Sequence, residues 1–237
     1  MLPVNTAAPA LPKPQRLGRQ RARSLEDKDL RRGHLLSAAA DLFAQSDFEG
    51  VTIAKMAQRA GVAKGTAYLY FSCKEAVFLE LLQVGLDEWA SGLHSALQTN
   101  AQGVDSQPVP AVIASSLAQR PLLGRLLVLL HTIIEPQLDL ESARSFKFFL
   151  HDLVERLSAS LVTHIDGLYP VQAAVFVLQM HALVISVTQL ASPPPVIAQV
   201  LQEDARLRGM VVSFEPFLSM TLSALLRGTL ATSPPTS

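Results

Sequence analysis

Residues 52–75 read TIAKMAQRAGVAKGTAYLYFSCKE, and this run predicts two short helices joined by a tight turn. Thr52 stands at the N-cap position before an apolar helical pattern that starts at Ile53. Gly61 interrupts that pattern, because glycine tolerates the left-handed backbone that a tight turn needs. A second short helix is expected over residues 63–70. The run therefore predicts a helix-turn-helix, a motif whose second helix lies in the major groove of DNA.

Longer helices are predicted on either side of this run. An apolar face predicts an amphipathic helix over residues 28–46. That face consists of Leu35, Leu36, Ala39, Leu42 and Phe43. After the run, a further helix is predicted over residues 74–97, with Ser72 or Cys73 at its cap. The first three helices form one small domain, and the fourth leads into the remainder of the chain.

Helical patterns continue along the rest of the chain, with no internal repeat and no β pattern. They fall at residues 110–118, 121–135, 141–165, 170–191 and 213–230, with a short helix near residues 195–205. Pro121 and Pro170 suit the first turns of two of these helices. The expected fold class is all-α, with a helix-turn-helix domain over residues 28–75 and a larger helical domain over residues 76–231.

The two ends of the chain are expected to be disordered, as a basic arm over residues 1–27 and a tail over residues 232–237. The arm begins with the helix breakers Pro3, Pro9, Pro12 and Pro14. It continues with Arg16, Arg19, Arg21 and Arg23. These arginines either reach along the DNA backbone or into a minor groove, or they belong to a solvated tail.

The composition indicates a folded protein with a basic front half. Hydrophobic residues make up 49% of the 237 residues, which excludes wholesale disorder. The net charge is zero, but residues 1–75 carry 12 Lys or Arg against 7 Asp or Glu, and the remainder carries 8 against 13. This asymmetry indicates a polyanionic partner for the front half, unless it is a chance distribution of solvated charges. A single cysteine and an N-terminus without a continuous apolar stretch both fit a cytoplasmic protein.

The core of the run, KGTAYLYF at residues 64–71 followed by Lys74 and Glu75, resembles the DNA-binding signature of the TetR family of bacterial regulators. The resemblance covers about residues 30–80, whereas the remainder matches that family only in architecture. It implies a transcriptional regulator, in the first place a repressor, that binds a palindromic operator on double-stranded DNA as a homodimer. It further implies release from DNA by a small apolar effector, with no enzymatic activity and no cofactor.

By this resemblance, Thr52, Tyr68, Tyr70 and Lys74 hold the DNA backbone, while Lys64, Gly65, Thr66 and Ala67 face the bases. Lysine reaches a phosphate or a guanine edge, and a lysine at a helix N-terminus adds its charge to free backbone N–H groups. Two assignments stay open, because Ala67 is small enough merely to pack and one of the two tyrosines can belong mainly to the core. Cys73 is either redox-sensitive or a small residue that fills a capping position.

The resemblance makes the rear domain a ligand-binding and dimerisation domain, in which helices enclose an apolar pocket. The candidate lining residues are Leu126, Leu130, His131, Ile134, Phe146, Phe149, Leu150, Met180 and His181. Each of them is either a pocket residue or ordinary core. The histidines of this half are His131, His151, His164 and His181, and no pair has the spacing of a metal site.

Residues 171–191 are apolar almost all round, which fits either a transmembrane helix or a helix buried on both sides. Four polar residues and the absence of flanking Lys or Arg anchors favour burial over a membrane. They are Gln172, Gln179, His181 and Gln189. We therefore expect the helices at residues 170–191 and 213–230 to form the homodimer interface, with no membrane association.

Three other functions compete with that of a ligand-controlled repressor. An enzyme would need a glycine-rich phosphate loop, a nucleophile elbow or a metal cluster, and the sequence contains no recognisable example. A DNA-binding protein on the same scaffold but without ligand control would have a filled rear core. An activator has no sequence feature that separates it from a repressor.

Overall fold

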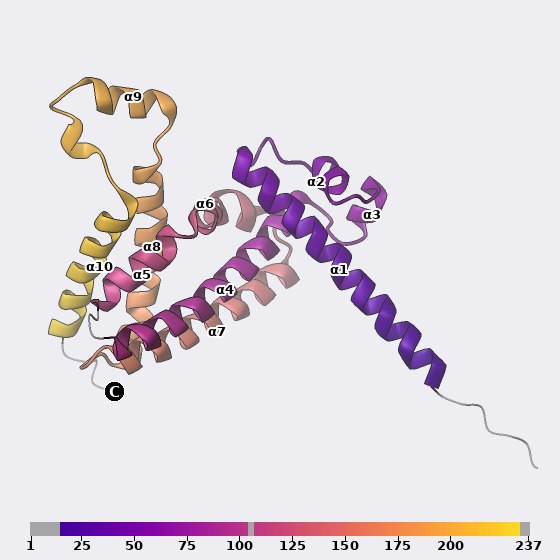
Figure 1. Ribbon diagram of the computed structural model, residues 1–237, viewed down its shortest axis with the longest axis horizontal. Helices are drawn as coiled ribbons and strands as arrows, with labels where there is room; N and C mark the ends of the chain where they lie inside the picture. The colour runs from indigo at the N-terminus through magenta and orange to yellow at the C-terminus, as the bar shows by residue number, and fades with distance from the viewer. Residues whose placement is uncertain (1–14, 104–106, 233–237) are drawn as a thin grey trace, which may run out of the picture.

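The computed structural model describes residues 15–103 and 107–232, and every regular element in these ranges is a helix (Figure 1). The α-helices are α1 (Gln15–Gln45), α2 (Ile53–Arg59), α3 (Lys64–Tyr68), α4 (Lys74–Gln102), α5 (Val109–Ala118), α6 (Pro121–Leu129), α7 (Leu140–His164), α8 (Pro170–Ala191), α9 (Pro195–Glu203) and α10 (Phe214–Ala231). Three short elements complete the set: η1 (Leu130–Ile134, a π-helix) and the 3-10 turns η2 (Glu135–Gln137) and η3 (Arg208–Met210). The predicted all-α fold is confirmed.

The front domain packs the second half of α1 against α2, α3 and the first turns of α4. Its centre is Phe78 of α4, which is fully buried. The ring of Phe78 meets those of Phe43 and Phe48 edge to face, with centroids 5.0 and 4.8 Å apart. Leu35 and Met56 close the core from α1 and α2. The amphipathic face predicted for residues 28–46 is thus the face that packs.

The rear domain is a bundle in which α4 and α7 lie side by side and α5, α8 and α10 form the far end (Figure 1). Helix α8 is the central element, since it packs against α6, α7 and α10. By length and composition α8 could cross a membrane, yet it buries Phe176, Met180 and Val184 among others in its own domain. Helix α9 stands away from the bundle in Figure 1 and has no buried residue.

Two predicted boundaries differ from the structure. Helix α1 begins at Gln15, so residues 15–27 are helical and the predicted disordered arm over 1–27 is wrong in that part. The reason is that the prolines end at Pro14, while residues 15–27 are mainly Arg, Gln, Leu and other residues that favour helices. Residues 1–14 of the predicted arm, and residues 233–237 of the predicted tail, lie outside the described residues.

The helix predicted over residues 121–135 is the second difference, because it changes form before its end. It is α-helical to Leu129, π-helical in η1 and then a 3-10 turn in η2. Pro136 accounts for the change, because proline lacks a backbone N–H and clashes with the carbonyl group four residues earlier in an α-helix. The π-helical turn places His131 on the surface beside α8, where it contacts His181.

Two connections join the front and rear domains. Helix α4 is continuous, with Phe78 in the front core and Leu86 and Trp89 in the rear domain. The second connection is Arg125 of α6, which donates through Nη1 to the Phe43 carbonyl oxygen and through Nη2 to that of Ser46, both at 2.7 Å. Helix α1 has no basic residue in its last turn, so Arg125 supplies the cation that a helix C-terminus favours.

Candidate nucleic-acid interface and internal cavity

Helices α2 and α3 are joined by the turn that the sequence predicts. Gly61 has a φ of 69°, the left-handed conformation that glycine adopts without strain. The Val62 N–H then bonds to the Ala57 carbonyl oxygen at 2.9 Å and directs the chain into α3. Thr52 is the N-cap of α2, as predicted, and its Oγ1 accepts from the Lys55 backbone N–H at 3.3 Å. The two helices therefore form a helix-turn-helix, in which Thr52 caps the first helix.

Replacing Thr52 with alanine is expected to lower the free energy of unfolding by about 1 kcal/mol, because the Lys55 N–H loses its capping acceptor. Urea unfolding followed by circular dichroism measures this change. Thr163→Ala is the matched control, since the Thr163 hydroxyl is exposed and bonds only to the Ala159 carbonyl oxygen within α7. Equal stability of the two variants would contradict the capping role of Thr52.

The exposed face of α3 is made by Lys64, Gly65, Tyr68 and Leu69. Tyr68 is 49% exposed and Leu69, just after the helix, is 80% exposed. The Lys64 ammonium lies 6.0 Å from the centroid of the Tyr68 ring, and a side chain on Gly65 would meet nothing within 4 Å. Thr66 is half-buried at the edge of this face. Leu69 is absent from the predicted site, although it lies four residues after Gly65, the spacing that places two residues on one helix face.

Two of the residues predicted to contact DNA face inward. Ala67 is 1% exposed and packs in the front core, so the prediction that it faces the bases is wrong. Successive residues of a helix point in different directions, so Ala67 faces the core although its neighbour Tyr68 is exposed. The small side chain of Ala67 lets α3 pack closely on that core. Tyr70 is half-buried and packs against the same core. Of the two tyrosines, Tyr68 projects into solvent and Tyr70 is the structural one.

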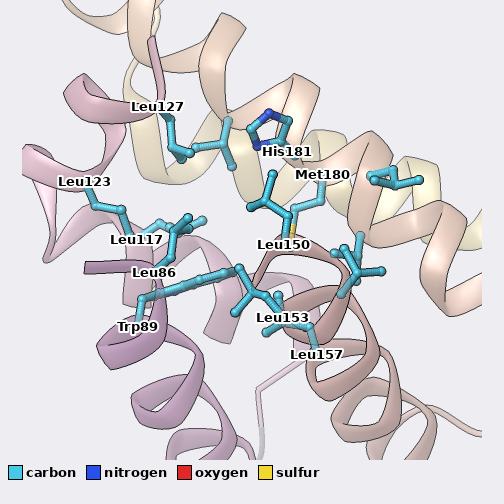
Figure 2. A pocket seen from close by; sticks show the side chains of 14 residues that line it. Leu86, Trp89, Leu117, Leu123, Leu127, Leu150, Leu153, Leu157, Met180 and His181 are labelled. Carbon is cyan, nitrogen blue, oxygen red and sulfur yellow. The ribbon is translucent and has the colours of Figure 1, made fainter. Parts of the chain in front are cut away.

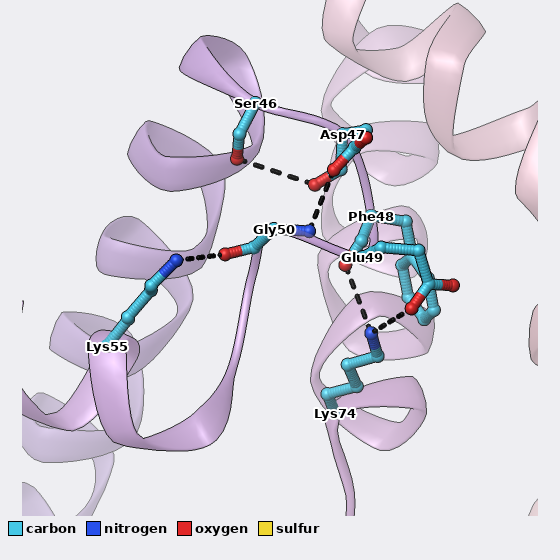
Figure 3. A network of polar contacts seen from close by, with 7 residues as sticks. All are labelled: Ser46, Asp47, Phe48, Glu49, Gly50, Lys55 and Lys74. Atoms are coloured by element: carbon cyan, nitrogen blue, oxygen red, sulfur yellow. Dashed lines mark hydrogen bonds and ion pairs between the residues drawn. The ribbon is translucent and has the colours of Figure 1, made fainter.

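Lys74 makes contacts within the protein (Figure 3). Its Nζ donates to the Phe48 carbonyl oxygen at 3.1 Å and lies 3.5 Å from Oε2 of Glu49. The ammonium also lies 3.8 Å from the centroid of the Phe48 ring, a cation–π contact. The Lys74 side chain is only 20% exposed. It fastens the start of α4 to the loop between α1 and α2, and its contact with a DNA phosphate stays a prediction.

The same loop is closed by two further hydrogen bonds (Figure 3). The Gly50 N–H donates to Oδ1 of Asp47 at 2.7 Å, and the Lys55 Nζ donates to the Gly50 carbonyl oxygen at 2.7 Å. These bonds hold the loop that leads into Thr52 and α2. The loop therefore fixes where α2 begins relative to α1.

Cys73 is the N-cap residue of α4, and its side chain makes no capping hydrogen bond. The thiol is half-exposed and lies 3.9 Å from the Ser72 hydroxyl. Redox sensitivity at this position remains a prediction.

A cavity of about 110 Å³ lies between α4, α5, α6, α7 and α8 (Figure 2). Its wall is apolar, formed mainly by leucines from all five of these helices. The side chains labelled in Figure 2 are Leu86, Trp89, Leu117, Leu123, Leu127, Leu150, Leu153, Leu157, Met180 and His181. Trp89 turns its indole N–H away to the Ser116 hydroxyl, at 3.0 Å. His181 is therefore the polar group left on the cavity wall.

Three of the nine predicted pocket residues line this cavity, namely Leu150, Met180 and His181. Four others are closed core with at most 1% of their surface exposed: Leu126, Leu130, Ile134 and Phe146. Phe149 packs partly buried against that core, and His131 lies on the surface beside His181. The prediction that these six line a pocket is corrected, because apolar periodicity marks a buried face without separating cavity wall from core.

A chain of polar side chains runs from the surface to the cavity through His181. Lys147 Nζ lies 2.6 Å from Oε1 of Glu135, and Oε2 of Glu135 lies 2.8 Å from Nδ1 of His131. Nε2 of His131 lies 3.1 Å from Nε2 of His181. Burial lowers the pKa of the His181 imidazole, and the neighbouring His131 adds to that shift. Burial alone raises the pKa of Glu135, but hydrogen bonds from Lys147 and His131 outweigh it and lower the pKa.

The other predicted histidines lie elsewhere. His151 is exposed with its Nδ1 3.4 Å from Oδ1 of Asp152, and Nδ1 of His164 lies 2.7 Å from the Ser160 carbonyl oxygen. Within residues 15–103 and 107–232, no group of three or more His, Cys, Asp or Glu is placed to hold a metal ion.

An apolar face lies along α8 and α10. On α8 it includes Val171, Val175 and Leu178, which are between 47 and 59% exposed. On α10 it includes Met220, which is 61% exposed. A groove between the two helices is floored by small residues such as Ala224 and Gly228. The predicted dimer helices therefore do present exposed apolar side chains.

Family models match both parts of the chain. Residues 35–81 match "Bacterial regulatory proteins, tetR family", and residues 83–233 match "Tetracyclin repressor-like, C-terminal domain". The boundary between the two matches falls within α4. Together they cover the helix-turn-helix and the bundle that encloses the cavity.

Curated relatives match over about a quarter to a third of the chain. The HTH-type transcriptional activator FasR of Mycolicibacterium smegmatis is 39% identical over 72 residues, 30% of this chain and 33% of the relative. The HTH-type transcriptional regulator RutR of Escherichia coli K12 is 41% identical over 59 residues, 25% of this chain and 28% of the relative. The chain thus spans about a third of the length of the curated relatives it matches.

Solved structures are similar over most of the chain. A crystal structure of a transcriptional regulator of Streptomyces coelicolor A3(2) has a TM-score of 0.54 and 21% identity, covering 85% of this chain and 99% of the other. At this identity the similarity concerns the fold.

Proposed function

The chain belongs to the TetR family of bacterial regulatory proteins and is a transcriptional regulator, and from this premise we propose that it is a ligand-responsive repressor. It binds a palindromic operator as a homodimer and leaves it when a small apolar effector enters the rear domain. The observation that carries the DNA-binding part is the exposed face of α3, where Lys64, Tyr68 and Leu69 project from a helix-turn-helix.

Helix α3 enters the major groove with Lys64 and Gly65 foremost, because both lie at its N-terminal end. Lys64 contacts a phosphate or a guanine edge, and Gly65 lets the backbone approach the DNA closely. The Tyr68 hydroxyl donates to a phosphate oxygen, and the exposed Leu69 packs on a thymine methyl group or a sugar. Thr66 contributes from the edge of the same face.

The homodimer forms through α8 and α10, whose exposed apolar side chains a second copy covers. Val171, Val175 and Leu178 on α8 and Met220 on α10 supply the apolar centre that such interfaces have. Two α3 helices related by the dimer axis then read half-sites about 34 Å apart, or a multiple of that distance. This arrangement requires a palindromic operator, and it keeps α8 buried in protein in a cytoplasmic molecule.

The effector enters the cavity between α4 and α8, and its binding changes the distance between the two α3 helices. The cavity wall includes Leu86 and Trp89 of α4 and Leu123 and Leu127 of α6. Both helices are connected to the front domain. Helix α4 extends into it, and α6 contacts the end of α1 through Arg125. An effector that spreads these helices therefore acts on α1 and α4. No catalytic residue, cofactor or metal enters this mechanism.

Activation of transcription is a second candidate, because one of the curated relatives is named a transcriptional activator. A reporter gene driven by the natural promoter separates the two. Deletion of the regulator raises expression if it represses and lowers expression if it activates.

The experiment that tests the DNA-binding proposal is selection of bound duplexes from a random DNA pool, with salt titration of the selected sequence. A palindrome with a steep salt dependence is the expected result. A folded dimer that enriches no sequence would contradict sequence-specific DNA binding by α3.

Replacing Lys64 with alanine is expected to weaken binding to the selected duplex by about 1–3 kcal/mol, roughly 5- to 150-fold. It should also reduce the salt slope by about one per protomer, because one phosphate-neutralising charge is lost. Arg144→Ala is the matched control, since Arg144 is an exposed cation on α7, in the rear domain. If both variants bind DNA like the parent, Lys64 does not contact the operator.

A further inference from the structure

The cavity between α4 and α8 has an apolar wall that contains one polar side chain with a free ring nitrogen. That side chain is His181, whose imidazole lies among the wall residues of α6, α7 and α8 (Figure 2). Its Nε2 is used in the contact with His131, and no side chain or backbone group in the described ranges pairs with its Nδ1. Whether Nδ1 donates or accepts a hydrogen bond follows from the hydrogen bonds between His181, His131 and Glu135.

With His131 neutral, hydrogen-bond accounting assigns one tautomer to each ring. Glu135 is a carboxylate and only accepts, so Nδ1 of His131 carries the proton in their 2.8 Å contact. In a neutral His131 the other ring nitrogen, Nε2, is then an acceptor. Nε2 of His181 must therefore carry the proton in the 3.1 Å contact between the two rings. This leaves Nδ1 of His181 with a lone pair, which makes it an acceptor.

We propose that the effector is an uncharged molecule of about one aromatic ring, carrying a hydroxyl group that donates a hydrogen bond to Nδ1 of His181. This inference rests on the proposed function, because it names the ligand of the same cavity. The volume of about 110 Å³ sets the size. Apolar cavities of roughly 150 Å³ accommodate benzene, so this smaller one suits at most a single ring, and the helices around it spread to admit the ring's substituents.

The surroundings of His181 favour a neutral donor over a carboxylate. The charged and titratable groups that face it are His131 from η1, Glu135 from η2 and Lys147 from α7. The ion pair between Glu135 and Lys147 is internally balanced and leaves no net charge to attract an anion. Burial lowers the pKa of His181, so its ring is neutral near pH 7. A carboxylate would face a lone pair in an apolar cavity, which is unfavourable.

The test compares three para-substituted toluenes that differ in one group: p-xylene, p-cresol and p-toluate. Trp89 lines the cavity and is the only tryptophan, so its fluorescence reports occupancy, and calorimetry gives the affinity. We expect p-cresol to bind about tenfold more tightly than p-xylene, the effect of one hydrogen bond in an apolar site. We expect p-toluate to bind more weakly than both.

The variant His181→Phe removes the acceptor and keeps an aromatic ring at the same position. It is expected to lower the affinity for p-cresol to that for p-xylene, while p-xylene binds as before. His151→Phe is the matched control, because His151 is exposed on α7 and does not line the cavity. Tight p-cresol binding by the His181→Phe variant would overturn the assignment of Nδ1 as the acceptor.

The pH dependence gives a second readout with a defined sign. A proton added to the His131–His181 pair removes the lone pair on Nδ1 of His181, so the affinity for p-cresol should fall as the pH is lowered. The affinity for p-xylene should stay level throughout. A preference for p-toluate at neutral pH, lost in the His181→Phe variant, would show a protonated ring and overturn the proposal.

The remaining outcomes separate this inference from the proposed function. Equal affinities for p-xylene and p-cresol, both reported by Trp89, would leave the cavity as an effector site and refute the hydroxyl donor. If none of the three compounds changes Trp89 fluorescence or releases heat, both the hydroxyl donor and the cavity as an effector site are refuted. Selection of a DNA sequence tests the DNA-binding part independently of all three.

Discussion

Replacing Phe78 with alanine is expected to lower the free energy of unfolding by about 3–5 kcal/mol and to abolish DNA binding. The Phe78 side chain is fully buried, and its ring makes edge-to-face contacts with both Phe43 and Phe48. Removing it leaves a cavity at the point where α1, the following loop and α4 meet. Because a typical domain is stable by only about 5–15 kcal/mol, a loss of this size removes much of the stability of the front domain.

Urea unfolding and binding to the selected duplex measure the two effects of this change. Phe148→Ala is the matched control, because Phe148 is 65% exposed on α7. It removes the same atoms without creating a cavity, so its unfolding should resemble that of the parent. A Phe78→Ala protein as stable as the Phe148→Ala protein would show that the front core does not depend on this ring. If the front and rear domains unfold separately, two transitions appear, and Phe78→Ala shifts the transition of the front domain.

The helices were predictable from the sequence because their signals are local. Thr52 and Gly61 mark the ends of α2, and Pro121 and Pro170 stand in the first turns of α6 and α8, as expected. Each of these residues acts through its own backbone geometry or capping group, which depends little on the rest of the fold. The extra turns at the start of α1 were missed because arginine-rich sequence fits both a helix and a solvated arm.

The site was less predictable, because it depends on which face of each helix packs. Ala67 and Lys74 belong to the matching signature, yet Ala67 turns into the core and Lys74 closes the loop over Phe48. A signature records residues needed for folding as well as residues needed for contact. Leu69 could have been found from Gly65, which lies four residues earlier and was predicted to face the DNA.

The cavity was harder still, because its wall comes from five helices. Leu117 and Leu157, for example, belong to α5 and α7 and meet only in the folded bundle. Their apolar periodicity is the same as that of Leu126, which lies in closed core. His181 was identifiable because it is a polar residue on an otherwise apolar helix. Its partner His131 lies in η1, where the chain departs from the α-helix before Pro136, and that departure was not predicted.

Arg125 is expected to carry the effect of the effector to the DNA-binding domain. It lies on α6 between Leu123 and Leu127, which both line the cavity. Its guanidinium donates to the carbonyl oxygens of Phe43 and Ser46 and lies 4.1 Å from the centroid of the Phe43 ring. A shift of α6 therefore pulls directly on the C-terminal end of α1. Gly124 favours such coupling, because it lets α6 lie close to Thr188 of α8.

Replacing Arg125 with alanine should uncouple the two domains without emptying the cavity. An effector typically changes DNA affinity by about 5–150-fold in coupled proteins, and in this variant we expect that ratio to fall toward one. The Trp89 fluorescence change on effector binding should persist, since Arg125 does not line the cavity. The measurement is affinity for the selected duplex, with and without whichever of the three toluene probes binds. Arg125→Lys should restore part of the ratio, because lysine donates to one carbonyl group at a time.

Arg120→Ala is the matched control for this experiment. Arg120 precedes α6 by one residue, and its Nη1 donates to the Ser116 carbonyl oxygen at 2.9 Å within the rear domain. It carries the same charge as Arg125 but bonds to α5 in place of α1, so its loss should leave the effector response intact. If Arg125→Ala keeps the full response, the signal must pass along α4, from Trp89 in the cavity wall to Phe78 in the front core. A loss of response in Arg125→Ala alone places the coupling at the junction of α6 with α1, since α4 is unchanged in that variant.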